Sequence, residues 1–287
     1  GDPLYLRFVL DQGFYPDGIW TAPDDQSLKK DILLSKDAGF NGARLHQKVF
    51  EERFHYWADQ LGYITWGESS SWGFNYNDSD ASRNFLIEWS EIIKRDRNHP
   101  SIIAWTPFNE SWDDSNITEH NRTHSEAYDI CKSLDNSRPV ITSSGGFHIS
   151  KTDIWTEHLY TQDPQIFINE LNPKQEVMYI RHPNRSVMYK GQPYVLDEFG
   201  GSRWNPKSDS NSWGYGEDPI TIEDFYDRLE QLVKSILNTK YIQGFCYTQL
   251  TDVEQEENGI YFYDRNKKFD MKIIKSIFSL EPEKNTN

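Results

Sequence analysis

Cysteine is scarce in this chain: only Cys131 and Cys246 occur among its 287 residues. Their spacing matches neither a zinc-binding motif nor a Cys-x-x-Cys redox pair, and one bridge would not provide a disulfide framework for a chain of this size. We therefore expect two free, buried thiols. No other cluster of ligand-type residues stands out, so we predict no metal ion and no cofactor.

Long hydrophobic runs and an excess of positive charge are missing as well. No apolar stretch approaches the ~20 residues of a membrane helix. The formal net charge is −15, whereas a protein that binds nucleic acid usually presents a basic face. We therefore expect neither a membrane nor a nucleic acid as partner. The first residues show no signal-peptide pattern, but a cleaved signal stays compatible, and we slightly favour a periplasmic or secreted location over the cytoplasm.

Aromatic residues, in contrast, are abundant, since they form 15% of the chain and include ten tryptophans. A soluble core does not need so many indole rings, whereas carbohydrate sites use flat rings that pack against the C–H face of a sugar. Five tryptophans fall in or near predicted loops after strands and form a candidate sugar platform: Trp20, Trp72, Trp112, Trp204 and Trp213.

Short apolar runs alternate with amphipathic segments along the chain, which is typical of βα units around a parallel sheet. The predicted strands are residues 5–10, 42–45, 63–66, 102–105, 139–142, 153–160, 194–197 and 242–247. Helical patterns separate most of them, and we expect an irregular excursion with a helix at residues 161–192. Eight strands predict an α/β protein with a closed (β/α)₈ TIM barrel in one domain, residues 1–287. An open doubly wound sheet is the alternative, but residues 11–16 are no phosphate-binding loop.

The active site of such a barrel lies at the C-terminal ends of its strands. Polar residues follow the predicted strands at Arg44, His46, Gln47, Glu68, Asn109, Glu110, His158, Tyr160, Glu198, Gln249 and Asp252. Glu110 and Glu198 follow the fourth and seventh strands, and glycoside hydrolysis needs two carboxyl groups that flank one bond. A separation of ~5–5.5 Å gives retention of the anomeric configuration, and ~6.5–9.5 Å gives inversion.

The residues around these two glutamates resemble glycoside hydrolase family 2, which contains β-galactosidases, β-glucuronidases and β-mannosidases. The run Arg-Asn-His-Pro-Ser-Ile-Ile-Ala-Trp at 97–105, followed by Phe-Asn-Glu at 108–110, looks like the acid/base signature of this family. The run Pro-Tyr-Val-Leu-Asp-Glu-Phe-Gly at 193–200 resembles its nucleophile strand. The similarity spans nearly the whole chain.

The resemblance implies roles for named residues. Glu110 would be the acid/base and Glu198 the nucleophile, Asn109 would bind the substrate 2-hydroxyl, Tyr160 would position the nucleophile, and Arg44 would support both glutamates. Further candidates for contact with the carbohydrate substrate are His46, His158, Trp112, Trp204 and Gln249.

The chemistry of a retaining enzyme also sets expectations for ionisation. We expect the pKa of Glu110 to be raised by the neighbouring carboxylate and by partial burial, so that it stays protonated near neutral pH. Glu198 should stay ionised, helped by hydrogen bonds and by Arg44. Asp197 precedes the nucleophile and, by strand alternation, should point away from it.

Several departures from the family bear on specificity and on the extent of the domain. The jelly-roll and immunoglobulin-like domains that precede the barrel in the family are absent, so we expect an excised catalytic domain, and a homo-oligomer stays open. Residues 44–47 read Arg-Leu-His-Gln, which shifts the family's histidine, and residues 247–250 lack the usual tryptophan. Residues 256–258 read Glu-Glu-Asn where glucuronidases carry Asn-x-Lys.

The resemblance implies a retaining exo-β-glycosidase that acts through a covalent glycosyl-enzyme, and we take the β-galactosidase type as the first choice only because it is frequent in the family. A β-mannosidase, β-glucuronidase or furanosidase specificity stays open, with the glucuronidase disfavoured because acidic residues repel a uronate. An endo-acting enzyme of the same clan stays open too, as does a barrel that binds carbohydrate with weak turnover or none.

Overall fold

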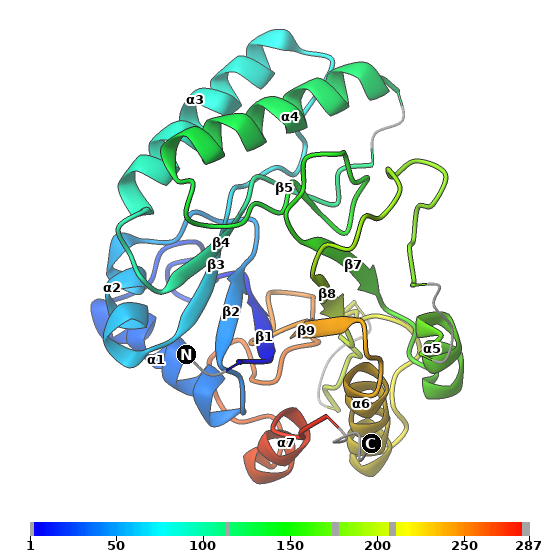
Figure 1. The fold of residues 1–287 in the computed structure, drawn as a ribbon. Helices are drawn as coiled ribbons and strands as arrows, with labels where there is room; N and C mark the ends of the chain where they lie inside the picture. The colour runs from blue at the N-terminus through cyan, green and yellow to red at the C-terminus, as the bar shows by residue number, and fades with distance from the viewer. Residues whose placement is uncertain (1–2, 113–114, 174–177, 207–210, 283–287) are drawn as a thin grey trace.

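Seven parallel strands form one sheet that curls into most of a barrel (Figure 1). The computed structural model describes residues 3–112, 115–173, 178–206 and 211–282. The strand order in this sheet is β4-β3-β2-β1-β9-β8-β7. The strands are β1 (Leu6–Asp11), β2 (Gly42–Leu45), β3 (Ile64–Glu68), β4 (Ile102–Thr106), β5 (Phe108–Asn109), β6 (Ser143–Ser144), β7 (Trp155–Leu159), β8 (Tyr194–Phe199) and β9 (Ile242–Tyr247).

Helices follow most of the strands and surround the sheet (Figure 1). In the described residues they are α1 (Asp25–Asp37), α2 (Glu52–Leu61), α3 (Ser79–Asp96), α4 (Ile117–Leu134), α5 (Pro164–Leu171), α6 (Ile222–Leu237) and α7 (Met271–Phe278). The side chains of Asp24, Asp78, Asp163 and Thr221 accept hydrogen bonds from first-turn N–H groups, which gives α1, α3, α5 and α6 defined starts. None of the described helices is long and apolar enough to cross a membrane.

Between β4 and β7 the barrel wall consists of very short strands and isolated bridges. Trp105 of β4 forms a parallel bridge with Val140, and β5 pairs in parallel with β6. A strand at residues 139–142 was therefore a wrong prediction, because regular pairing is confined to this bridge and to residues 143–144. Pro139 has no N–H to donate, and the backbone N–H of Val140 donates to Asp153 Oδ2 at 2.9 Å instead of to a neighbouring strand.

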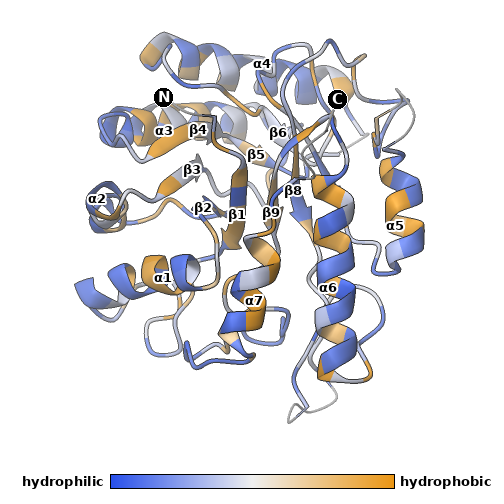
Figure 2. Ribbon diagram, turned by 60° about the horizontal axis from the view of Figure 1, so that its bottom comes forward, coloured by the Kyte–Doolittle hydropathy of each residue, from blue (hydrophilic) through white to orange (hydrophobic). Residues whose placement is uncertain are grey.

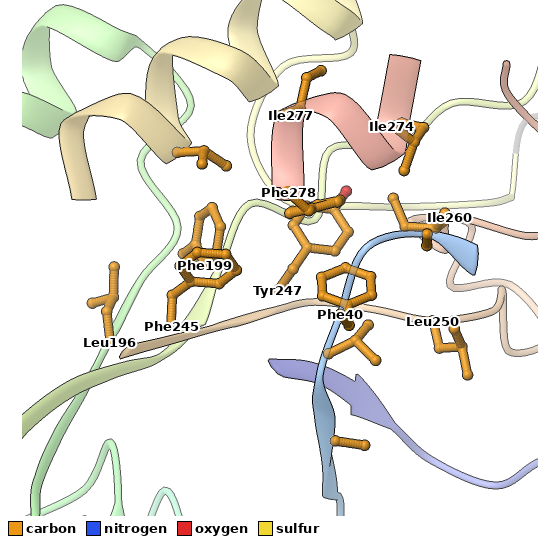
Figure 3. Close-up of a cluster of buried hydrophobic side chains, with 14 of the residues drawn as sticks. Phe40, Leu196, Phe199, Phe245, Tyr247, Leu250, Ile260, Ile274, Ile277 and Phe278 are labelled. Carbon is orange, nitrogen blue, oxygen red and sulfur yellow. The ribbon is translucent and has the colours of Figure 1, made fainter. Parts of the chain in front are cut away.

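Apolar side chains fill both the inside of the barrel and the layer between strands and helices. The interior cluster consists of Phe8, Leu10, Trp66, Ala104, Ile141, Val195 and Cys246. Outside, the Tyr247 ring lies 5.2 Å from that of Phe278 on α7, and the Phe199 ring packs edge-on against Phe245 and Tyr247 (Figure 3). Apolar and polar residues interleave along α6 and α7 (Figure 2), as expected for helices with one covered face. Cys131 and Cys246 are free and buried.

Candidate active site

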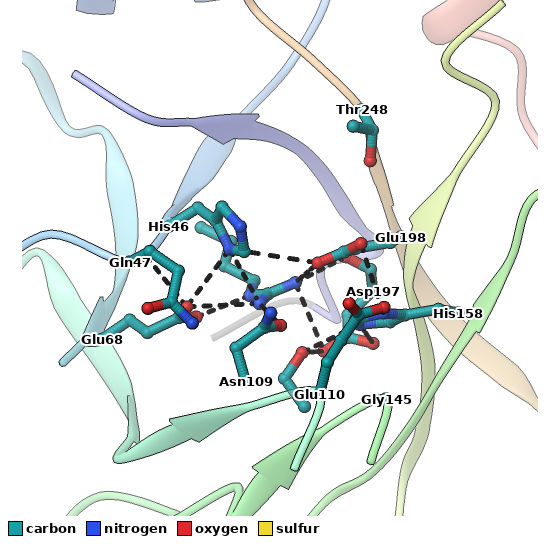
Figure 4. A network of polar contacts seen from close by, with 12 residues as sticks. His46, Gln47, Glu68, Asn109, Glu110, Gly145, His158, Asp197, Glu198 and Thr248 are labelled. Carbon is teal, nitrogen blue, oxygen red and sulfur yellow. Dashed lines mark hydrogen bonds and ion pairs between the residues drawn. The ribbon is translucent and has the colours of Figure 1, made fainter. Parts of the chain in front are cut away.

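A buried arginine joins the C-terminal ends of several strands. Arg44 of β2 is fully buried. Its Nε lies 2.7 Å from Glu68 Oε2, its Nη1 lies 2.6 Å from Glu198 Oε1, and its Nη2 donates to Asn109 Oδ1 at 2.5 Å. Figure 4 shows Glu68, Asn109 and Glu198 converging on this point from β3, β5 and β8. Because a buried charge is tolerated only when it is paired, the carboxylates fix the guanidinium, and the guanidinium in turn fixes Glu198.

Glu110 directly follows β5 and enters the same cluster with an unusual backbone. Its φ is 47°, in the left-handed region that costs a residue with a side chain roughly 1–2 kcal/mol. The backbone N–H of Glu110 donates to Ser144 O at 2.8 Å, and its side chain is 15% exposed. Such strain is concentrated at functional sites, where the surrounding structure holds it in place.

His158 of β7 lies between the two glutamates (Figure 4). Its Nδ1 is 2.8 Å from Glu110 Oε1 and 3.2 Å from Glu198 Oε2. Its Nε2 is 3.0 Å from Ser144 Oγ and 3.4 Å from Asp197 Oδ1. Gly145 allows this placement, because a Cβ at that position would lie 2.4 Å from His158 Cγ, and its φ of 62° also favours glycine.

The two carboxylates are close enough to act on one anomeric carbon. One oxygen of Glu110, one of Glu198 and a ring nitrogen of His158 all lie within 4.8 Å of one another. These oxygens lie closer together than the ~6.5–9.5 Å that leaves room for an attacking water in an inverting enzyme, so the spacing is compatible with retention. The three groups could also hold a metal ion, but only if His158 released the proton that it shares with the carboxylates, so the absence of a metal stays a prediction.

The charges in this cluster change the expected ionisation of Glu110. Burial by itself favours the neutral acid, but the hydrogen bond and the charge of His158 outweigh it and lower the pKa of Glu110 below its ordinary value. The expectation of a raised pKa is therefore wrong for this arrangement. His158 shows the reverse balance: burial favours the neutral ring, yet the charges of Glu198 and Asp197 raise its pKa to about 10. The proton thus resides on His158, next to Glu110.

Three other predicted residues lie in the cluster. Asn109 is buried, and its Nδ2 has no hydrogen-bond partner in the described part of the chain, so its two N–H donors are left for a ligand. Tyr160 donates a hydrogen bond to Glu198 Oε2 and lies 3.0 Å from Thr248 Oγ1. His46 Nδ1 lies 3.2 Å from Glu68 Oε1 and 4.0 Å from Glu198 Oε1. Their roles toward a substrate stay predictions.

The remaining candidates lie further from the reacting carboxylates. Trp112 stacks under Arg181, whose Nη1 lies 3.8 Å from Glu110 Oε1. Gln249 is buried and bonds to Gln12 and Asn258. Trp204 packs against the main hydrophobic core. The other loop tryptophans, Trp20, Trp72 and Trp213, are exposed.

Sequence reasoning missed several members of the cluster. Glu68 was placed at the strand ends by the sequence but given no role, although it is the partner of Arg44 Nε. Asp197 was expected to point away, but it accepts from Ser144 Oγ at 2.7 Å behind His158; register irregularities on both sides of β8 break the simple alternation there. Tyr215 stacks on Tyr160 with ring centroids 3.5 Å apart, from a loop that carries no recognisable motif.

A family model now matches this architecture. Residues 21–280 match the model "Glycosyl hydrolases family 2, TIM barrel domain". The chain belongs to glycosyl hydrolase family 2. The match covers nearly the whole chain, and it confirms the (β/α)₈ barrel and the family assignment made from the two glutamate segments.

Curated relatives of this family 2 domain include β-galactosidases. That of Vibrio vulnificus is 27% identical over 213 residues, which cover 71% of this chain and 19% of the relative. That of Lactococcus lactis is 32% identical over 152 residues, which cover 50% of this chain and 14% of the relative. The chain thus spans about a fifth or less of the length of these relatives.

Solved structures with the same fold include family 2 enzymes of other specificities. A β-galacturonidase from Eisenbergiella tayi bound to galacturonate has a TM-score of 0.77 at 20% identity and covers 97% of this chain and 52% of its own. A β-glucuronidase from Parabacteroides merdae has a TM-score of 0.77 at 15% identity, with 98% and 37% covered. At these identities the likeness shows the fold alone.

Arg44 is expected to be essential for stability as well as for the site. Arg44→Met would leave Glu68 and Glu198 buried without their counter-charge, and breaking a buried ion pair typically costs about 3–5 kcal/mol. Urea denaturation measures the change. The matched control is Arg53→Met, because Arg53 Nε also lies 2.7 Å from a carboxylate, Asp25 Oδ1, but both side chains are exposed. We expect no measurable change there, and equal losses in both variants would contradict the assignment.

His158 should make the stability of this family 2 domain fall at alkaline pH. Its pKa is raised in the fold from 6.5 to about 10. The folded state therefore binds this proton more tightly than the unfolded state does, and the resulting stabilisation is complete below pH 6.5 and is lost as the pH rises through about 10. The free energy of unfolding should fall more steeply between pH 7 and 10 in the wild type than in His158→Gln. Parallel curves would show that His158 is neutral in the fold.

Proposed function

We propose that this family 2 domain is a retaining exo-β-glycosidase that removes terminal neutral β-linked sugars, with β-galactosides as the first choice. The observation that carries the proposal is the pair of carboxylates, Glu110 and Glu198, whose oxygens lie within 4.8 Å of one another and of one nitrogen of His158. The similarity to curated β-galactosidases supports the choice of sugar.

In the first step Glu198 would attack the anomeric carbon as the bond to the leaving oxygen breaks. Arg44 and Tyr160 each hold one oxygen of Glu198 by a hydrogen bond, so the carboxylate is oriented before the substrate arrives. The leaving oxygen takes a proton from Glu110. This proton would come from His158 Nδ1, which lies 2.8 Å from Glu110 Oε1. The imidazole ring therefore holds the proton that the carboxyl group of Glu110 later donates to the leaving oxygen.

In the second step the roles of Glu110 reverse. Glu110, now ionised, would take a proton from water and pass it back to His158 Nδ1, and the water oxygen would displace Glu198 from the anomeric carbon, which restores the β configuration. Asn109 would donate its free Nδ2–H to the hydroxyl on the carbon next to the reacting centre. The nucleophile leaves as a carboxylate, again paired with Arg44.

The test is the anomeric configuration of the first product. A panel of aryl β-glycosides that differ in the sugar identifies a substrate, and proton NMR during its hydrolysis should show the β-hemiacetal forming before mutarotation. An α-hemiacetal would exclude the retaining mechanism. Binding of sugars without turnover of any glycoside in the panel would favour a carbohydrate-binding barrel instead.

A further inference from the structure

Two histidines on one face of α4 contact the residue that follows Glu110. His120 and His124 lie one turn apart, and their rings stack with centroids 3.8 Å apart. His124 Nε2 is 2.7 Å from Ser111 Oγ, and His120 Nε2 is 3.1 Å from the Ser111 carbonyl oxygen. Ser111 Oγ also lies 2.6 Å from Ser143 Oγ of β6. All four of these residues are buried, and we call them the Ser–His clamp.

The partners within the Ser–His clamp determine which atom donates each hydrogen bond. His124 Nδ1 lies 2.7 Å from the carbonyl oxygen of His120, which can only accept, so this nitrogen carries a proton. Burial, and then the charge of His120, lower the pKa of His124 well below its ordinary value, so the ring is neutral and its Nε2 is an acceptor. The Ser111 hydroxyl therefore donates to His124 and accepts from Ser143, which fixes the orientation of the Ser111 side chain.

The Ser–His clamp holds the chain on both sides of Glu110. Before Glu110, the ring of His124 lies 4.2 Å from that of Phe108 on β5, and Figure 1 shows α4 next to this strand. After Glu110, the carbonyl oxygen of Ser111 also accepts from the backbone N–H of Phe147 at 3.0 Å. The backbone N–H of Glu110 itself is bonded to β6. The backbone is therefore fixed before, at and after Glu110.

This arrangement accounts for the left-handed backbone of Glu110. A φ of 47° is unfavourable for a residue with a side chain, and it persists only where the surrounding structure imposes it. With Phe108 and Ser111 both held, Glu110 cannot return to a negative φ, and its Oε1 stays 2.8 Å from His158 Nδ1. Loss of the Ser–His clamp would let this backbone relax and would move the carboxyl group. A displacement of ~1 Å from the productive geometry can lower a rate by ~10²-fold.

We propose that His124 is a positioning residue that, through Ser111, holds Glu110 in the orientation from which it protonates the leaving oxygen. His124 is fully buried and acts through Ser111 rather than on the sugar. The inference rests on the proposed glycosidase activity. It predicts that only substrates that need a proton from Glu110 depend on His124, whereas a polar cluster that merely stabilised the fold would affect every substrate alike.

The experiment compares His124→Phe with Thr123→Val on two glycosides of the same sugar. One has a dinitrophenyl leaving group, which departs as a stable anion, and the other has an alkyl leaving group, which needs a proton. Phenylalanine keeps a ring on α4 but offers no acceptor to Ser111. Thr123 is the matched control because it is as buried as His124 and its hydroxyl lies 3.3 Å from Ser82 Oγ on α3, away from the Ser–His clamp.

The measured quantity is the ratio of kcat/KM for the two substrates. His124→Phe should lower kcat/KM for the alkyl glycoside by about 10- to 100-fold and that for the dinitrophenyl glycoside by less than about threefold. Thr123→Val should leave the ratio unchanged, even if it lowers the stability of the fold. Thermal denaturation shows whether each variant is folded at the assay temperature.

Further variants separate positioning from folding. Ser111→Ala removes the same hydrogen bond from its other end with little change in volume, and it should show the same dependence on the leaving group. His124→Gln places an amide oxygen near the position of Nε2 and should restore most of the activity toward the alkyl glycoside. In a Glu110→Ala background, His124→Phe should cause no further loss, because it acts only through Glu110.

The outcomes distinguish this assignment from the activity on which it rests. Equal losses for the two leaving groups in His124→Phe and Ser111→Ala, or a further loss in the Glu110→Ala background, would overturn the role of His124 while the glycosidase stands. If His124→Phe does not fold, Ser111→Ala decides. Failure of the wild type on every glycoside would overturn both proposals.

Discussion

Glu198→Gln is expected to lower kcat by roughly 10⁴-fold or more on every substrate that the wild type hydrolyses. The amide is close in size to the carboxylate; its oxygen can still accept from Arg44 while its NH2 group faces the Tyr160 hydroxyl, so the fold and the binding of sugar should persist. It cannot form the ester to the anomeric carbon, however, and both chemical steps depend on that ester. Steady-state kinetics measure the loss.

A second variant at the same position tests whether Glu198 acts as the nucleophile. In Glu198→Ala the space beside Arg44 is open to a small anion, and added azide should restore turnover and yield the α-glycosyl azide, because one displacement inverts the centre. Glu170→Gln on α5, an exposed position, is the control and should behave as the wild type. Wild-type activity in Glu198→Gln would exclude Glu198 as the nucleophile.

The loss of activity in Glu110→Ala is expected to depend on the leaving group of the substrate. For sugar or alkyl leaving groups, which need a proton, kcat/KM should fall by about 10²–10⁴-fold. A dinitrophenyl leaving group departs as a stable anion, so formation of the glycosyl-enzyme from such a substrate should be nearly unaffected. A plot of rate against leaving-group pKa measures the difference, and its slope should become steeper in the variant.

The pH profile supplies an independent check of the same residue. The wild type should lose activity at alkaline pH, as the proton held by His158 and Glu110 is released. This limb should disappear in Glu110→Ala for the dinitrophenyl substrate. An equal loss for good and poor leaving groups would show that Glu110 acts by positioning rather than by proton transfer.

The strands of the barrel were predictable because they are apolar runs between clear breaks. The predicted bounds of β2 and β9, residues 42–45 and 242–247, agree with the structure. The failure at residues 139–142 has a physical cause, since that arc is held by single bridges and side-chain bonds rather than by a ladder with its own sequence pattern.

The site was predictable where a residue follows a strand, and it was not where partners come from distant segments. Glu110, Glu198, Arg44 and His158 all follow or end a strand, and the structure brings them together. The pKa of Glu110 depends on His158, which lies 48 residues further along the chain. No local pattern reveals that contact, so the sign of the shift could not be inferred.

The left-handed backbone at Glu110 has a consequence for evolution. Glycine adopts a φ of 47° without strain, and asparagine does so more easily than glutamate. Selection for thermodynamic stability alone would therefore replace Glu110 by one of these residues. Glutamate at this position lowers the stability of the fold, but it is needed for hydrolysis. In a lineage no longer selected for hydrolysis, position 110 should drift first, whereas Arg44, on which the barrel depends, should persist.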